Sequence, residues 1–318
     1  MNDKDEILHI HTRKTSAIKS LIEALKEIFR DVCIKFTPKI TKQLESDPTK
    51  TRTTGGMYIT ALNSNSNILV RLHLEADKFC SYKCEPDENK NYIMVGVNMS
   101  NLHKLIKFLN TDDELDLILK NSSQHILNLQ YINKQKRFTS NYYLNLLDLK
   151  EENIVIGKQK FDFAITMPSN DFHSLIKNMS IISEKVDIKF ITSNGNYSLI
   201  FSCTGEFASQ ESIFNGSTNS PSDTMINVIK NDDPESSTPN NKTDDIIQGV
   251  YALNALSLFS RCSSLCPNIE LYIKNDSPLV IKYRVADMGS IHLILSPMND
   301  DNNLNNSDND SDDSNDEE

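Results

Sequence analysis

The segment PLVIKYRVADMGSIHLILSP (residues 278–297) contains two runs in which apolar residues alternate with polar ones. The runs lie at 279–285 and 290–295, and alternation is the period of a β-strand that buries one face. Between them stand the residues Ala-Asp-Met-Gly (286–289). The segment therefore predicts two strands that flank a turn near the C-terminal end of the folded chain.

Alternating runs recur along the chain and are typical of strands. They lie at 57–62, 68–74, 92–97, 115–119, 126–132, 186–191, 197–203, 246–251 and 269–273. Four other segments show the spacing of amphipathic helices, at about 15–30, 100–109, 169–182 and 252–262. Thr15 or Ser16 is the expected cap of the first helix and Ser100 that of the second. The mixture predicts an α+β fold.

The four predicted helices form two pairs related by a shift of about 153–154 residues. A shift of 154 lays Ile18, Leu21, Ile22, Leu25 and Ile28 on Phe172, Leu175, Ile176, Met179 and Ile182. A shift of 153 lays Gly96-Val97 on Gly249-Val250 and Leu105-Ile106 on Leu258-Phe259. Any two amphipathic helices align passably, but the shared offset of both pairs favours an internal duplication.

Three segments lack both patterns. We expect a polar loop at 43–56, a disordered insertion at about 215–245 with one short apolar run (225–229), and a disordered acidic tail at 299–318. The tail carries nine acidic residues and no Lys or Arg, so removing it changes the net charge from −11 to −2. The folded part is therefore nearly neutral, and any basic surface on it must be local.

The composition is that of a soluble intracellular protein with a real core. The chain has 318 residues, 38% of them hydrophobic, which allows one large or two modest domains. No stretch approaches the roughly 20 apolar residues of a membrane helix, and the polar start MNDKDEILHIH is no secretory signal. The chain has six cysteines, and two pairs of them have the spacing C-x3-C (80/84 and 262/266). No nearby His completes a zinc site with either pair. We expect reduced thiols in or near the core.

The polar faces of the predicted helices carry cations. They are Lys19, Lys26 and Arg30 on the first helix, Lys104 and Lys107 on the second, His173 and Lys177 on the third, and Arg261 at the end of the fourth. Any single face of this kind is more simply a solvated helix surface. Four such faces in a duplicated unit suggest instead one common surface that meets phosphate.

This surface lacks the residues that base readout would need. No helix is packed with Arg and Asn, and aromatic residues do not alternate with the cations as stacking on single strands requires. Sequence-independent contact with the phosphate backbone remains, and such binding is weak and salt-sensitive. A protein that binds DNA weakly yet must stay on it can do so by encircling it.

Two other classes of protein remain open. One is an enzyme, although the chain has no G-x-x-x-x-G-K-[ST], G-x-G-x-x-G, H-E-x-x-H or G-x-S-x-G motif. His9-x-His11 is interpreted as strand alternation rather than a metal site. We therefore expect no catalytic residues, no cofactor and no metal. The second class is a free-standing acidic adaptor.

Several motifs resemble the proliferating cell nuclear antigen family of sliding clamps. The strongest is 278–297, which is similar to the C-terminal signature of the family, two strands around Ala-Asp-Met-Gly. The others, in family order, are EALK (23–26), VGVNMSNLHKLIKFL (95–109), YYLNLLDL (142–149) and MPSNDFHSLIKNMS (167–180). They are spread over nearly the whole chain up to residue 298.

The resemblance implies a DNA-clamp fold of two similar domains, each a duplicated βαβββ unit, with strands outside and helices lining a ring. The N-terminal domain would be 1–145, the linker 146–162 and the C-terminal domain 163–298. It also implies a non-enzymatic DNA polymerase processivity factor. A homotrimer would encircle duplex DNA without sequence preference and tether polymerase, clamp loader and other replication and repair proteins that carry a short glutamine/aromatic motif.

The resemblance assigns roles to residues of this sequence by position. The implied DNA-facing cations are Lys19, Lys26, Lys104, Lys107, Lys177 and Arg261. The implied partner-binding pocket comprises Leu62, Leu69, Ile154, Ile156, Phe161, Pro278, Ser296 and Pro297, with Met298 on its rim. The implied subunit interface joins about 137–145 to about 207–215 and includes Tyr142, Tyr143 and Phe207. Ser20 and Asn254 stand where the family often has cations, and Gly157 stands where its linker usually has proline.

The resemblance also leaves an alternative within the same fold. Checkpoint-type clamps assemble as heterotrimers, so this chain could be one subunit of such a ring. The long predicted loops and the Asn/Lys/Ile-rich composition favour a divergent lineage, such as a large DNA virus or an AT-rich protist. The expected location is the nucleus, or a cytoplasmic replication factory if the protein is viral.

Overall fold

The computed structural model describes residues 5–298 apart from 45–46, 66, 152–153, 155–156, 158–159, 162, 194, 218–225 and 231–244. The expected pocket residue Ile156, most of the expected insertion and the acidic tail lie outside the described residues.

Strands make up most of the described chain. In order they are β1 (Glu6–Thr12), β2 (Asp31–Leu44), β3 (Asp47–Leu62), β4 (Ile68–Glu75), β5 (Ser81–Cys84), β6 (Ile93–Asn98), β7 (Glu114–Lys120), β8 (Ile126–Asn133), β9 (Phe138–Asn145), β10 (Phe163–Pro168), β11 (Lys185–Ser193), β12 (Asn196–Thr204), β13 (Ser209–Ser217), β14 (Asn227–Lys230), β15 (Asp245–Ala252), β16 (Asn268–Tyr272), β17 (Leu279–Val285) and β18 (Gly289–Leu295). Every run predicted as a strand from its alternation is a strand, which confirms those predictions.

Four α-helices accompany the strands: α1 (Thr15–Ile28), α2 (Met99–Ile106), α3 (Ser169–Ile182) and α4 (Leu253–Ser260), with the 3-10 helix η4 (Arg261–Leu265) after α4. α3 begins 154 residues after α1 (15 to 169), and α4 begins 154 residues after α2 (99 to 253). α1 and α3 also have the same length, 14 residues, and α2 and α4 both have 8 residues. One offset therefore relates both pairs, as a duplication requires.

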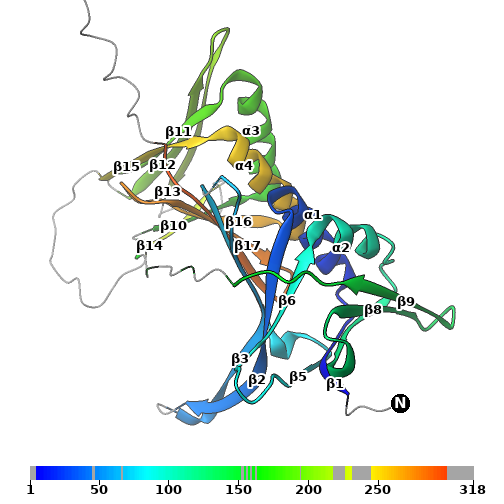
Figure 1. The fold of residues 1–318 in the computed structure, drawn as a ribbon. Helices are drawn as coiled ribbons and strands as arrows, with labels where there is room; N and C mark the ends of the chain where they lie inside the picture. The colour runs from blue at the N-terminus through cyan, green and yellow to red at the C-terminus, as the bar shows by residue number, and fades with distance from the viewer. Residues whose placement is uncertain are drawn as a thin grey trace, which may run out of the picture.

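The strands form three sheets. A five-stranded sheet has the order β5-β1-β7-β8-β9 and a four-stranded sheet the order β13-β12-β11-β15. Between them lies a nine-stranded sheet with the order β14-β10-β16-β17-β18-β4-β3-β2-β6. Figure 1 shows the two smaller sheets at opposite ends of the molecule and the four helices together along one side of it. The arrangement is the α+β architecture that the sequence predicted.

The nine-stranded sheet joins the two halves of the chain through one strand pair. β18, from the C-terminal half, pairs antiparallel with β4, from the N-terminal half, from Gly289↔Leu74 to Leu295↔Ile68. β18 also pairs with β17 along its whole length. Leu72 and Ile291, which are opposite one another in this register, are both fully buried.

The turn between β17 and β18 also binds the N-terminal half. The amide of Met288 donates to the carbonyl of Val285 at 2.9 Å, and the carbonyl of Met288 accepts from the amide of Glu75 at 2.8 Å. A Cβ on Gly289 would lie 2.0 Å from the carbonyl oxygen of His73, so only glycine allows the two backbones to approach this closely. The side chain of Asp287 forms an ion pair with Lys14, directly before α1.

Three local predictions were wrong. Of residues 43–56, expected as a polar loop, 43–44 belong to β2 and 47–56 to β3, and the two strands pair with one another. The pattern missed them because strand pairing satisfies the backbone groups whether the side chains are polar or apolar. Within the expected insertion, 215–217, 227–230 and 245 belong to strands, and β14 extends the large sheet at β10. Asn98 rather than Ser100 caps α2, accepting from the amide of Asn101 at 3.0 Å, and α1 has no side-chain cap.

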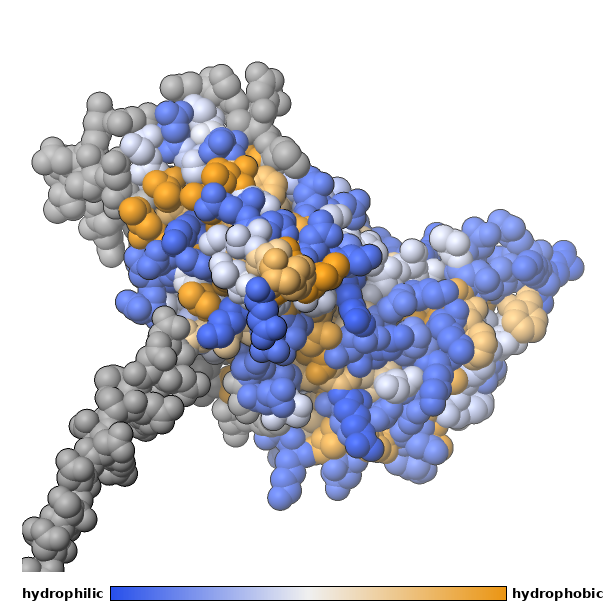
Figure 2. Space-filling model, turned by 90° about the horizontal axis from the view of Figure 1, so that it is seen from above, coloured by the Kyte–Doolittle hydropathy of each residue, from blue (hydrophilic) through white to orange (hydrophobic). Residues whose placement is uncertain are grey.

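The surface and the core are clearly separated. Leu, Ile, Val and Phe side chains from all three sheets and all four helices form one buried cluster. Figure 2 shows a mostly hydrophilic surface on which hydrophobic side chains gather in a few patches. Among the described helices, none combines the length and the apolar composition that a membrane span needs. Three of the six cysteines (84, 203 and 262) are buried and all six are free thiols, although Cys80 is exposed.

Replacing Gly289 by alanine should destabilise the junction between the two halves. The added Cβ would overlap the carbonyl of His73, so we expect Gly289→Ala to lower the free energy of unfolding by about 2 kcal/mol. Chemical denaturation followed by circular dichroism measures this change. Gly157→Ala is the matched control, since a Cβ there meets nothing within 4 Å; equal stability of both variants would contradict the close approach.

Candidate nucleic-acid interface and protein-binding surfaces

The six cations that were expected to face DNA all lie on or directly after the helices, but they are not equally available. Lys104, Lys107, Lys177 and Arg261 are exposed. Lys19 and Lys26, both on α1, are half-buried. Their positions on or next to helices agree with the helical spacing of the sequence, whereas the contacts of each cation depend on neighbouring elements.

Lys19 binds backbone carbonyls at the end of the neighbouring helix α2. Its ammonium donates to the carbonyl of Lys107 at 2.9 Å and to that of Leu109 at 3.4 Å. These carbonyls follow the last turn of α2, where helical carbonyl groups have no partner of their own and carry partial negative charge. Lys19 therefore stabilises the end of α2 and offers less of its charge to a ligand.

Lys26 approaches a histidine that the sequence analysis did not single out. Its ammonium lies 3.4 Å from both ring nitrogens of His103 on α2. Burial and the Lys26 charge hold the pKa of His103 below its ordinary value. The ring is therefore neutral at pH 7 and does not add a cation to this surface.

Arg261 joins the two halves of the molecule. Its guanidinium forms an ion pair with Glu27 near the end of α1, and α1 contacts both α4 and η4. The pair is partly exposed, so it neutralises local charge more than it adds stability. Among the described residues of this face, Lys104, Lys107 and Lys177 are exposed and have no acidic partner.

On the opposite face of the large sheet, apolar residues line up across five strands. The cross-strand partners are Leu62↔Leu69, Leu69↔Ile294, Ile294↔Val280 and Val280↔Tyr272, and Phe161 packs against Tyr272 with ring centroids 5.6 Å apart. We call these six residues the apolar row. Its face is opposite to that of Leu293 and Leu295, which are buried in the core.

The apolar row contains three of the expected pocket residues and three residues that were not expected. Leu62, Leu69 and Phe161 are half-buried members of it. Val280, Ile294 and Tyr272 were missed, although the alternation of β18 places Ile294 on the outer face between two core leucines. Of the other expected residues, Ile154, Pro278 and Pro297 are half-buried and Ser296 is exposed.

The start of the linker is held against the edge strand β6. The amide of Leu147 donates to the carbonyl of Gly96 at 2.8 Å, and a Cβ on Gly96 would lie 2.3 Å from the carbonyl oxygen of Leu147. Further along, Glu151 accepts from the ammonium of Lys35 at 2.7 Å and from the hydroxyl of Tyr92. Lys35 also lies 3.7 Å above the Tyr92 ring. We call Lys35, Tyr92 and Glu151 the linker clasp.

The expected subunit interface corresponds to two edge strands. β9 is the last strand of the five-stranded sheet and β13 the last strand of the four-stranded sheet. Tyr143 on β9 and Phe207, just before β13, are exposed, at 67% and 73%. Tyr142 is half-buried against Tyr131 of its own chain. An edge strand presents backbone groups that another strand can pair with.

A polar cluster lies on the outer face of the five-stranded sheet. His9 and His11 in β1 both contact Oδ1 of Asp116, at 3.3 and 2.7 Å, and His9 also lies 3.1 Å from Glu6. The hydrogen bond with Asp116 raises the pKa of His9 against the effect of burial. The predicted strand alternation of His9 and His11 is confirmed. Within the described part of the chain, no group of three or more His, Cys, Asp or Glu residues could hold a metal ion.

Comparison with known families and proteins agrees with this geometry. The family model "Proliferating cell nuclear antigen, N-terminal domain" matches residues 7–153, and "Proliferating cell nuclear antigen, C-terminal domain" matches residues 155–298. The chain is similar to a "Probable DNA polymerase sliding clamp" of Acanthamoeba polyphaga mimivirus, 31% identical over 94% of this chain and 63% of that protein. It is also similar to "Probable DNA polymerase sliding clamp 1" of Paramecium bursaria Chlorella virus 1, 28% identical over 94% of this chain and 99% of that protein.

The His9 contact should make stability depend on pH. Because the folded-state pKa of His9 is raised above 6.5, its contribution is complete below pH 6.5 and is lost as the pH rises through the folded-state value. We expect the free energy of unfolding to fall more steeply above pH 6.5 in the wild type than in His9→Gln. Urea titrations at a series of pH values measure the two slopes. The exposed His125→Gln variant should retain the wild-type slope; an unchanged slope in His9→Gln would contradict the assignment.

Breaking the linker clasp should loosen the start of the linker. Glu151→Gln removes the charge that Lys35 and Tyr92 bind, so amide exchange at 147–151 should accelerate roughly three- to tenfold. Hydrogen–deuterium exchange with mass spectrometry measures this locally. Glu85→Gln removes a comparable exposed pair with Lys83 and should leave the linker unchanged. Equal exchange in wild type and Glu151→Gln would show that the clasp does not hold the linker.

Proposed function

Because the chain belongs to the proliferating cell nuclear antigen family, we propose that it is a DNA sliding clamp. Three copies close into a ring around duplex DNA, and the ring tethers DNA polymerase without catalysing a reaction itself. The observation that supports this most is the joint placement of helices and sheet edges. The four helices lie together along one side, and the edge strands β9 and β13 belong to sheets at opposite ends (Figure 1).

Two different edges on one chain suit a closed head-to-tail assembly. If β13 of one copy extends the sheet at β9 of the next, each contact uses one edge of each type, and repetition closes a ring or continues as a filament. The helix side of the sheet would then face the same direction in every copy. We propose that the ring is a homotrimer; the alternative is a heterotrimer of the checkpoint type, in which other chains supply the neighbouring edges.

The helix surface suits weak contact with a DNA backbone. Lys104, Lys107 and Lys177 are exposed, whereas Lys19, Lys26 and Arg261 are partly engaged within the chain. With so few available cations, binding to phosphate is weak and salt-dependent. Retention on DNA then comes from closure of the ring around the duplex, and the ring can slide because no contact reads a base.

We propose that the apolar row binds protein partners. Five of its six side chains, all except the buried Val280, are only half-buried. Half-buried apolar side chains next to a linker are a suitable site for aromatic anchors of a short peptide segment. Ile154 of the linker and Pro278 and Pro297 would border the anchors, with Ser296 at the C-terminal side. The polymerase, the clamp loader and other replication and repair proteins are the expected partners, each presenting a glutamine and aromatic residues.

The location follows from the proposed function. The relatives named above are proteins of DNA viruses, so this clamp would act where viral DNA is replicated in a host cell. That place is the nucleus or a cytoplasmic replication factory.

The proposal is tested by how long the protein stays on DNA. After loading with a clamp loader, the ring should remain on circular DNA, or on linear DNA with blocked ends, and leave linear DNA through its free ends. Single-molecule fluorescence measures the residence times. Equal residence on blocked and free ends would overturn retention by encirclement, and native mass spectrometry should find a trimer of the single chain; a stable monomer would favour the heterotrimer.

The cation surface is tested in the same assay. We expect the double variant Lys104→Glu/Lys177→Glu to reduce loading at least about tenfold at moderate salt and to lower the salt dependence of DNA binding. Both side chains are exposed, so the trimer should persist. Lys42→Glu, an exposed cation in the β2–β3 hairpin, is the control and should load normally. Normal loading of the double variant would remove the helices from the DNA contact.

A further inference from the structure

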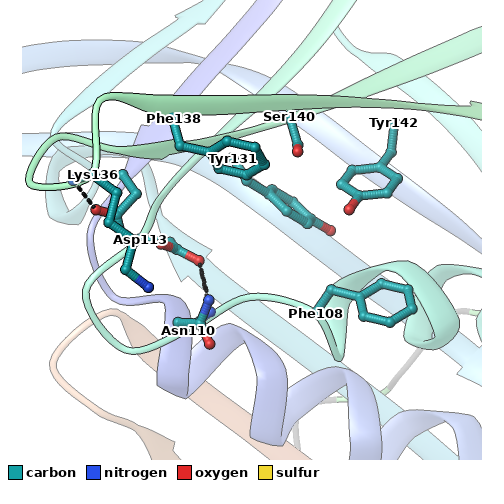
Figure 3. A pocket seen from close by; sticks show the side chains of 9 residues that line it. Phe108, Asn110, Asp113, Tyr131, Lys136, Phe138, Ser140 and Tyr142 are labelled. Carbon is teal, nitrogen blue, oxygen red and sulfur yellow. Dashed lines mark hydrogen bonds between the residues drawn. The ribbon is translucent and has the colours of Figure 1, made fainter.

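The acidic group in the cavity beside β9 is paired within the chain. This cavity, of about 330 Å³, is lined by residues from the end of α2, the segment after it, β8 and β9. Figure 3 shows that the side-chain amide of Asn110 donates to Asp113, at 3.0 Å. Asn133 donates to the same carboxylate at 2.7 Å. The carboxylate is therefore satisfied, whereas the charges on the outer face of the large sheet are not.

A row of basic residues crosses that outer face beside the apolar row. Lys282 of β17 lies opposite His292 of β18, and His292 lies opposite Arg71 of β4. We call these three residues the basic row. Each of them stands two positions from a member of the apolar row on its own strand, so the two rows share one face and lie about 7 Å apart. The neighbours are Val280, Ile294 and Leu69.

The two charged residues of the basic row differ in how well they are paired. Lys282 donates to Glu270 at 2.9 Å, and the same carboxylate accepts from the hydroxyl of Tyr272 and lies 3.7 Å from Arg284. Arg71 is exposed and has no acidic partner among the described residues. Three cations therefore stand against the carboxylate of Glu270 in this part of the described face, which is left with a positive charge.

His292 separates the two charged residues without adding a charge. Burial, together with the charges of Lys282 and Arg71, holds the pKa of His292 below its ordinary value. The ring is therefore neutral at pH 7. Lys282 and Arg71 lie two strand spacings apart, about 10 Å, so an anion above the ring would be attracted by both.

The position of the basic row favours a protein segment as its ligand. Side chains that are two residues apart in an extended peptide point the same way and lie about 7 Å apart, which is also the separation of the two rows. A peptide with an aromatic side chain on the apolar row can thus place an Asp or Glu on the basic row. A phosphate backbone would reach the cations but would leave the half-buried apolar side chains uncovered.

The acidic tail of this chain starts on the far side of the apolar row. Along β18 and beyond, the outward positions are His292 in the basic row, Ile294 in the apolar row and then Ser296. The amide of Met298 donates to the carbonyl of Val250 in β15 at 2.8 Å, so the chain leaves β18 toward the four-stranded sheet. Residues after Met298 would have to turn back across the apolar row to reach the basic row, whereas a partner segment needs no such reversal.

We propose that the basic row binds acidic side chains of a partner protein whose aromatic anchors occupy the apolar row. This inference rests on the proposed partner site and adds the charge that the site selects. The apolar row supplies contact area, and Arg71 and Lys282 select segments that carry Asp or Glu within about two residues of an anchor. Segments with Lys or Arg at those positions are repelled, so the basic row ranks partners that share the same anchors.

Three synthetic peptides with the same glutamine and aromatic anchors test the selection. One carries Asp and Glu beside the anchors, the second Asn and Gln, and the third Lys. We expect the wild-type chain to bind the acidic peptide at least about tenfold more tightly than the neutral one at low salt, and the lysine peptide most weakly. The difference should shrink as salt rises, since exposed charges are screened. Fluorescence anisotropy measures the affinities.

Reversing one charge of the basic row should reverse the preference. Arg71→Glu should bind the lysine peptide more tightly than the acidic one and should leave the affinity for the neutral peptide within about twofold of the wild-type value. Arg71 is exposed, so circular dichroism should show a folded chain. Arg52→Glu is the matched control, because it changes an exposed arginine of β3 that lies opposite Lys42, away from the basic row.

His292 reports where the acidic side chains bind. A carboxylate beside the ring favours its protonated form, so the acidic peptide should raise the pKa of His292 relative to the neutral peptide. The charged groups around this ring are Lys282, Arg284 and Glu270 on one side and Arg71 on the other. NMR titration of histidine-labelled protein measures the shift. An equal pKa with both peptides would place the acidic side chains elsewhere and overturn the inference.

The remaining outcomes distinguish this inference from the proposed function. Equal affinity for the three peptides would overturn the selection by the basic row and leave the apolar row as a binding site, whereas failure of all three to bind would overturn that site. Displacement of the acidic peptide by an oligonucleotide would assign the row to nucleic acid instead. Replacing the acidic residues of 299–318 by Asn and Gln should change the affinity for the acidic peptide less than about threefold; a tenfold gain would make the tail the occupant.

Discussion

The antiparallel pairing of β18 with β4 is the constraint on which the rest of the structure depends. Each half of the chain has its own small sheet and its own pair of helices, and only this ladder turns two such units into one nine-stranded sheet. Buried leucines and isoleucines on both strands exclude water from the ladder, and Gly289 lets the turn approach the backbone of β4. Because the sheet is continuous, the two helix pairs lie on the same side of it.

The same continuity creates the two faces of the molecule. On the helix side, core residues of β18 such as Leu293 face inward under the helices, while on the other side Ile294 aligns with Leu69 of the N-terminal half. The apolar row therefore crosses the junction and exists only when both halves are joined. The linker lies beside β6, where Gly96 and the linker clasp hold its first residues.

The sequence places cations on the helices, but their contacts in the folded chain determine how much of their charge is available. Lys19 binds the carbonyls at the end of α2, Lys26 approaches His103, and Arg261 pairs with Glu27 across the two halves. These contacts reduce the charge that the helix surface can offer to a ligand. In the proposed clamp, such a surface would make only weak contact with the phosphate backbone of DNA, which is compatible with movement along it.

The sequence by itself determined the elements and their repetition. Alternation and helical spacing are local properties of the chain, so they located eleven of the eighteen described strands and all four helices, and the common shift revealed the duplication. The motif around 286–289 identified the family, and the family supplied the positions of the cations and of several residues of the apolar row.

Only the tertiary structure decided which residues meet across long separations. The pairing of β18 with β4, the contact of Arg261 with Glu27, and the membership of Ile294 in the apolar row depend on strand register and helix packing. The pairing of the polar ends of β2 and β3 was missed for the same reason, because it satisfies backbone groups that no side-chain pattern reports. Period and composition describe one element at a time, whereas a junction or a pocket is formed by several elements that only folding brings together.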